Sequence, residues 1–188
     1  VVDSDWHQKY IGIIESPVHQ ILLNKDKIIV SDISSSYDFL EGKKIFKHKG
    51  DGPLENIAIH KGNLFHATPW SLIGPGNEVI SELSPNTSSI QYKGIFSIGE
   101  KLYHILTDYW VDGKPNNDIS KVVNTETSEV IMERPGRLKG LAGNNNLLVD
   151  FGEQDIFNTK KNEKILTLND FETDVPDRYK SNIHRVLV

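Results

Sequence analysis

Two histidines stand at equivalent places in a repeated pattern and are the first candidates for chemistry. His66 ends the phrase "KGNLFH" and His104 ends the phrase "GEKLYH", so each follows a turn signal at the same distance. A neutral imidazole binds metals and titrates near physiological pH, which would suit a metal pair or a proton-transfer pair. The sequence offers no further ligands at a supporting spacing. We therefore expect no metal site, and we interpret both histidines as half-buried groups that hydrogen-bond between neighbouring units.

Acidic residues gather in two segments, Asp108–Asp118 and Asn169–Asp177. Carboxylate and carbonyl oxygens are suitable ligands for a hard cation. Neither segment matches the D-x-[DN]-x-[DN]-G pattern of a calcium loop. Both segments are rich in turn-forming residues, so we interpret them as solvated connections.

Motifs for nucleophilic, zinc-dependent and nucleotide chemistry are missing from the sequence. There is no G-x-S-x-G elbow, no H-E-x-x-H pair and no Walker loop, and the chain contains no cysteine. The glycine-rich stretches Gly74–Gly76 and Gly136–Gly143 read as turns, since no helix follows them to face a phosphate. We expect a protein without a cofactor and without a catalytic activity of its own.

The charge of the chain argues against nucleic acid and membrane surfaces as partners. The net charge is -5, whereas such binding depends on clustered lysine and arginine. Lys43–Lys49 is the exception, with five basic side chains in seven residues. We interpret it as an exposed edge strand, which lysine protects from pairing with other chains. No apolar run approaches the roughly 18 residues that span a bilayer. The sequence does not indicate a cellular compartment.

A phrase of two short apolar runs around a turn occurs four times. Taking Lys27, Asn63, Lys101 and Asn146 as equivalent, the spacings are 36, 38 and 45 residues. The two positions after each anchor and the position five before it are apolar in all four units. The predicted turns between the runs are Lys25-Asp26, Lys61-Gly62, Gly99-Glu100 and Asn144-Asn145, of residue types that suit β-hairpins. A further strand pattern follows each hairpin, and no long helical stripe interrupts the series.

This repeat resembles the β-propellers of the WD-repeat, quinoprotein-like and surface-layer types. Blades of such proteins are roughly 40 to 45 residues long, and the phrases "VVNTETSEVI" and "IFNTKKNEKIL" are similar to their outer strands. The resemblance implies an all-β propeller with about four blades, at residues 18–50, 55–84, 92–134 and 137–169. Partial strands at 1–17 and 182–188 indicate a segment of a larger propeller, able to associate through open edges. A β-sandwich or open meander is the alternative.

The four predicted turns should lie on one rim of such a propeller, with the partner-binding face at the opposite rim. At the opposite ends of three hairpins stand Asp32, Asp108 and Asp150, which we interpret as residues that start turns, and Thr68 stands nearest to this place in the remaining unit. An aromatic residue follows in every unit. Tyrosine and tryptophan dominate binding hot spots because they bury a large area at low rotamer cost. The candidate binding residues are Tyr37, Trp70, Tyr109, Trp110 and Phe151.

The first functional hypothesis is therefore a non-catalytic scaffold that binds a protein or peptide. The alternative is the propeller domain of a larger enzyme, for example a serine peptidase resembling the prolyl oligopeptidases, with its catalytic domain outside this chain. A propeller enzyme with a lactonase-like metal site would need a repeated acidic column facing the centre, which the sequence does not show.

Overall fold

The computed structural model of the 188-residue chain describes residues 17–24, 27–48, 53–85, 89–111, 113–138, 140–143, 147–150, 155–158 and 163–167. Within these ranges, sixteen strands form four antiparallel sheets of four strands each. In the described part of the chain the one helical element is a 3-10 turn, η1 (Pro75–Asn77). The prediction of an all-β chain with four repeated units is confirmed.

The strands of each sheet follow one another in chain order. The first sheet holds β1 (Gln20–Asn24), β2 (Lys27–Ser31), β3 (Ser35–Asp38) and β4 (Lys43–Lys47). The second sheet holds β5 (Asn56–His60), β6 (Asn63–Ala67), β7 (Ser71–Ile73) and β8 (Val79–Glu82). The third holds β9 (Ile90–Ile98), β10 (Lys101–Val111), β11 (Lys114–Asn124) and β12 (Val130–Pro135). The fourth holds β13 (Leu141–Gly143), β14 (Leu147–Asp150), β15 (Asp155–Asn158) and β16 (Glu163–Thr167).

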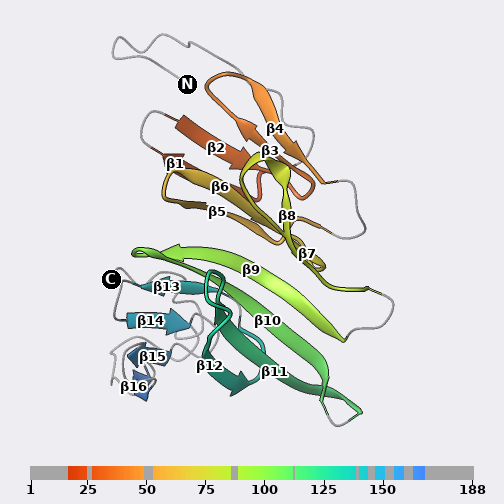
Figure 1. Ribbon diagram of the computed structural model, residues 1–188, viewed down its shortest axis with the longest axis vertical. Helices are drawn as coiled ribbons and strands as arrows, with labels where there is room; N and C mark the ends of the chain where they lie inside the picture. The colour runs from red at the N-terminus through yellow and green to blue at the C-terminus, as the bar shows by residue number, and fades with distance from the viewer. Residues whose placement is uncertain are drawn as a thin grey trace, which may run out of the picture.

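Figure 1 shows the four sheets succeeding one another from the orange end of the chain to the blue end. The first strands are the inner ones, since β1 contacts β5, β5 contacts β9 and β9 contacts β13. The basic run at Lys43–Lys47 forms β4, the outermost strand of the first sheet, as the edge-strand interpretation predicted.

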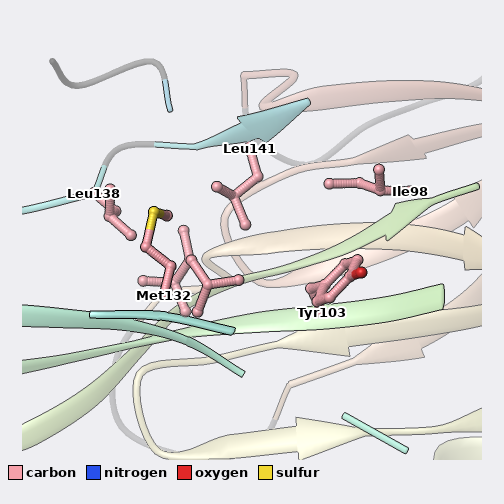
Figure 2. Packing of buried hydrophobic residues seen from close by; sticks show 7 residues of the cluster. Ile98, Tyr103, Met132, Leu138 and Leu141 are labelled. Atoms are coloured by element: carbon pink, nitrogen blue, oxygen red, sulfur yellow. The ribbon is translucent and has the colours of Figure 1, made fainter. Parts of the chain in front are cut away.

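The hydrophobic core is divided into three clusters, one between each pair of successive sheets. Phe46 and Ile57 belong to the cluster between the first and second sheets, and Leu72 and Tyr92 to the next. Figure 2 shows the third cluster, in which Leu141 of the fourth unit lies close to the buried side chains of the third sheet. The middle sheets therefore bury both faces, which explains why their strands carry apolar runs rather than strict alternation.

Two of the four predicted hairpin turns lie in the described residues, and their backbones have the expected form. Lys61 and Gly62 have φ values of 49° and 78°, as a type I′ turn requires, and Gly99 has a φ of 61°, as in type II′. Figure 1 places both turns on the same side of the molecule, at its left. Lys25-Asp26 and Asn144-Asn145 lie outside the described residues.

The fourth hairpin differs in register from the other three. Equal units would pair Leu141 with Leu148, as Leu22 pairs with Ile29 in the first sheet. The structure pairs Leu141 with Asp150 instead. A shift by two residues keeps every side chain on its own face of the sheet, so the apolar columns match in sequence although the pairing differs.

Candidate functional site

At the rim opposite the described turns, a polar side chain on the second strand or just after it accepts main-chain N–H groups in each of the first three sheets. In the first sheet, Asp32 Oδ1 accepts the main-chain N–H of Ser34 at 2.7 Å. In the second sheet, Thr68 Oγ1 accepts the N–H groups of Trp70 at 3.3 Å and of Ser71 at 2.9 Å. Short polar side chains at the end of a strand commonly form such turns.

The third sheet has the same contact within a strand, because Asp108 and Trp110 both lie in β10, with a β-bulge between them. Asp108 Oδ1 accepts the main-chain N–H of Trp110 at 3.0 Å. Trp70 and Trp110 therefore occupy the same position, two residues after the capping side chain, in adjacent sheets. The interpretation of Asp32 as a turn-starting residue is confirmed, because its side chain caps the turn before β3. For Asp108 the interpretation is wrong, because this residue lies within β10, next to a β-bulge. The side chain of Asp150 lies outside the described part of the chain.

The third sheet is longer than its neighbours at this rim. β10 and β11 each have eleven residues, whereas the strands of the second sheet have three to five. Figure 1 shows the β10–β11 hairpin extending beyond the other sheets. The segment Asp108–Asp118, interpreted above as a solvated connection, is thus mostly strand. Trp110 lies on this extension with 57% of its surface exposed. Insertions in a repeat protein often mark its binding face.

Tyr109 is fixed at the base of the extension by two cations. Lys93 Nζ lies 5.3 Å and Arg137 Cζ 4.7 Å from the centre of its ring. Each cation also has a carboxylate, because Lys93 pairs with Glu55 at 3.0 Å and Arg137 pairs with Asp118. Burial on its own lowers the pKa of Lys93, but the contacts with Tyr109 and Glu55 outweigh it and raise that pKa. The ring is held by cation–π contacts, next to Trp110 on the same strand.

One of the five candidate residues does not join this surface. Tyr37 lies in β3 and is only 7% exposed, and its hydroxyl donates to Asp32 Oδ2 at 3.0 Å. The chain has already turned back within Asp32–Ser34, so Tyr37 is part of the core rather than of the loop. Phe151 lies outside the described residues. We call the remaining surface the tryptophan rim, defined by Trp70, Tyr109 and Trp110.

The inner strands enclose a groove of about 490 Å³ on the central side of the sheets. None of its lining residues carries an ionisable side chain, so they offer no group for acid–base chemistry. The lining comprises Gln20, Leu22, Leu23, Asn56, Ile57, Ala58, Ile59, Ile95, Phe96, Ser97, Ile98 and Leu141.

Two amide side chains in this groove connect one inner strand to the next. Gln20 accepts the main-chain N–H of Ile57 at 2.9 Å and donates to its carbonyl at 3.0 Å. Asn56 makes the same pair of bonds to Ile95, at 2.7 Å and 2.8 Å. We call these contacts the amide clips. The sequence reasoning missed them, although Gln20 and Asn56 both stand seven residues before their anchors.

The two equivalent histidines have separate hydroxyl partners. His66 Nε2 lies 2.8 Å from Ser36 Oγ of the preceding sheet, and its ring stacks on Phe46. His104 Nδ1 lies 3.0 Å from Thr125 Oγ1 of its own sheet. Burial lowers the pKa of each to about 4. Both rings are neutral at physiological pH, and only His66 bonds between sheets as expected.

The described residues hold no group of three or more acidic or histidine side chains arranged to bind a metal ion. In the same part of the chain, no helix has the length and apolar character that crossing a membrane requires.

No protein-family model matches the sequence. The structure is similar to the WD40 domain of Pan2 from Neurospora crassa, with a TM-score of 0.53 and 14% identity over 80% of this chain and 51% of that one. Weaker likenesses are to BamB from Moraxella catarrhalis (TM-score 0.49, 11% identity, 78% of this chain and 47% of that one) and to PorZ from Porphyromonas gingivalis (TM-score 0.45, 13% identity, 75% and 19%).

The sheet order, the shared inner groove and the likeness to the Pan2 domain together define the class of protein. The chain has the fold of a partial β-propeller with four four-stranded sheets. It spans about half the length of the Pan2 domain that it matches. The predicted superfold is confirmed, and at this level of identity the likeness shows the fold alone.

Proposed function

We propose that this chain is a non-catalytic propeller scaffold that binds a protein or peptide partner through the tryptophan rim. The observation that carries the proposal is the repeated hydrogen bond from the tryptophan N–H to the side chain two residues before it, which places Trp70 and Trp110 at equivalent positions of adjacent sheets, on the side where the third sheet is extended. Hydrogen bonds fix both main chains before any partner arrives. Pre-ordered aromatic residues lose little entropy on binding and are typical hot spots.

The conformation of the tryptophan rim supports binding of a partner, and not only packing of its rings against the core. Trp110 exposes more than half of its surface, although Tyr109 beside it is held between Lys93 and Arg137. A rigid base with an exposed ring offers contact area without requiring a loop to become ordered. The alternative, a propeller domain of a larger peptidase, stays a prediction.

The test is the replacement of Trp70 and Trp110 by Ala, with Val79→Ala as a matched control because Val79 is 59% exposed on the outer strand β8. The full chain is used to isolate a partner, which is then purified and titrated by calorimetry. Each tryptophan change should weaken binding by about 30-fold, equivalent to about 2 kcal/mol. Val79→Ala should leave binding unchanged.

The melting temperatures of the same variants separate binding from packing. If both tryptophan variants bind the partner as the unmodified chain does, the rim is not the binding face. If they mainly lower the melting temperature, the rings serve the core.

A further inference from the structure

A hollow of about 210 Å³ lies on the third sheet near the tryptophan rim. Its floor is three strands wide, because Ile90 of β9 and Ile119 of β11 both stand opposite Asp108 of β10. Leu106 of β10 and Lys121 of β11 complete the lining. These two residues are paired with each other, two positions away from the pair of Asp108 and Ile119. Leu106 also packs against the core between the second and third sheets. The hollow therefore opens on the side of the third sheet that faces the second.

Hydrogen bonds of the main chain place both the loop that carries Trp70 and the segment of β10 that carries Trp110 beside this hollow. The N–H of Tyr92 donates to the carbonyl of Pro69 at 2.9 Å, so the loop that carries Trp70 lies against β9, close to Ile90. Trp110 is bonded through its own N–H to Asp108, which lines the hollow. The hollow is thus bordered by the partly buried Trp70 and the exposed Trp110.

The charge of the hollow is negative. Asp108 Oδ1 accepts hydrogen bonds from Ser89 Oγ at 2.5 Å and from the N–H of Trp110, and both donors are neutral. Lys121 already pairs with Glu133 at 2.9 Å. Within the ranges that the structure describes, no cation forms an ion pair with Asp108. The uncompensated charge in the hollow is therefore that of the Asp108 carboxylate.

We propose that this hollow binds an extended segment of a protein partner through one large apolar side chain, next to a lysine or arginine that pairs with Asp108. Ile90, Leu106 and Ile119 supply the apolar surface. The volume is below the roughly 300 Å³ at which small-molecule sites begin, and suits a single side chain. The negative charge of Asp108 beside the hollow favours a lysine or arginine next to the apolar side chain of the partner. The proposal rests on the proposed function and specifies the chemistry of its partner.

The experiment titrates the full chain, labelled at isoleucine and leucine methyl groups, with three synthetic Gly-Ser peptides followed by NMR. The peptides carry Leu-Arg, Leu-Glu or Ala-Arg at their centre. The Leu-Arg peptide should shift the methyl signals of Ile90, Leu106 and Ile119 in a saturable way. The other two peptides should bind at least tenfold more weakly.

Two variants test the apolar and the charged parts separately. Ile119→Phe fills the hollow and should abolish binding, whereas Val130→Phe, on the exposed outer strand β12, should not. Asp108→Asn keeps an acceptor for the N–H of Trp110 but removes the charge. It should abolish the preference for Leu-Arg over Leu-Glu while the melting temperature stays close to that of the unmodified chain.

Equal shifts from all three peptides, or a charge preference that survives Asp108→Asn, would overturn the proposal. The two proposals can fail independently. If the tryptophan variants lose the protein partner but the hollow takes no peptide, only the present inference is wrong. If the hollow takes the peptide and the tryptophan variants still bind the partner, the rim as the main binding face is wrong.

Discussion

Buried histidines are the residues whose protonation matters most to this fold. His66 lies between Ser36 and the ring of Phe46, and its Nδ1 is buried without a hydrogen-bond partner. A proton added to Nδ1 would place a charge against an aromatic ring with nothing to accept its hydrogen bond. The neutral form is therefore part of the packing between the first two sheets, which is a different role from metal binding.

We expect the chain to lose stability as the pH falls from 6.5 towards 4. The pKa values of His66 and His104 are about 4 in the folded chain, against an ordinary value of 6.5. In that interval the unfolded chain binds more protons, so the free energy of unfolding decreases as the pH decreases. The loss should be about 2 kcal/mol per histidine by pH 5. Urea unfolding at pH 7 and pH 5 measures it.

His66→Gln separates the pH effect from the loss of the side chain. Glutamine can still bond to the hydroxyl of Ser36 but does not titrate. The variant should be less stable at pH 7 and show a smaller loss between pH 7 and pH 5. An unchanged loss would contradict the assignment of the effect to His66.

At the scale of the strands, the amide clips connect the inner strand of one sheet to the inner strand of the next. Gln20 and Asn56 each satisfy an N–H and a carbonyl of the next inner strand. The series ends at Gly94, the equivalent position of the third sheet. Gly94 has a φ of 144°, and a Cβ there would lie 2.6 Å from the ring of Phe96. Gly94 has no side chain, and this leaves room for the Asn56 side chain that bonds to the next residue, Ile95.

Removing either clip should loosen the contact between two sheets. Gln20→Ala and Asn56→Ala each leave two main-chain groups of the next strand without partners, at a cost of about 1–3 kcal/mol. Amide exchange should accelerate at Ile57 in the first variant and at Ile95 in the second. Gln20→Glu is the matched control, since it keeps the acceptor for the N–H of Ile57. Unchanged exchange at these amides would show that the clips contribute nothing.

At the scale of the whole molecule, the first sheet exposes an apolar side. Leu22 packs into the core, whereas its neighbours Ile21 and Leu23 on β1 are 59% and 78% exposed. Apolar residues exposed together on an inner strand favour association with another surface.

We therefore expect the isolated chain to self-associate through this side. Sedimentation velocity should show a mass that increases with concentration, and Leu23→Lys should shift the chain to the monomer. Ile165→Lys, on the exposed outer strand β16, is the control and should leave the association unchanged. A compact monomer at all concentrations would contradict the expectation.

The sequence alone was enough for the repeated architecture, because the columns around Lys27, Asn63, Lys101 and Asn146 record short-range rules. Turn residues that tolerate positive φ and apolar positions that must be buried act within a few neighbours along the chain. The same rules identified Asp32 as a residue that starts a turn. These features needed no knowledge of distant contacts.

Only the tertiary structure decided which side chains belong to the rim and which to the core. Tyr37 and Trp110 look alike in sequence, but one is buried in β3 and the other stands on an extended hairpin. The amide clips and the hollow beside Asp108 join residues that are far apart in the chain. Burial and hydrogen bonding between sheets depend on how successive units pack against each other. A repeat pattern describes each unit by itself and carries no information about the contacts between units.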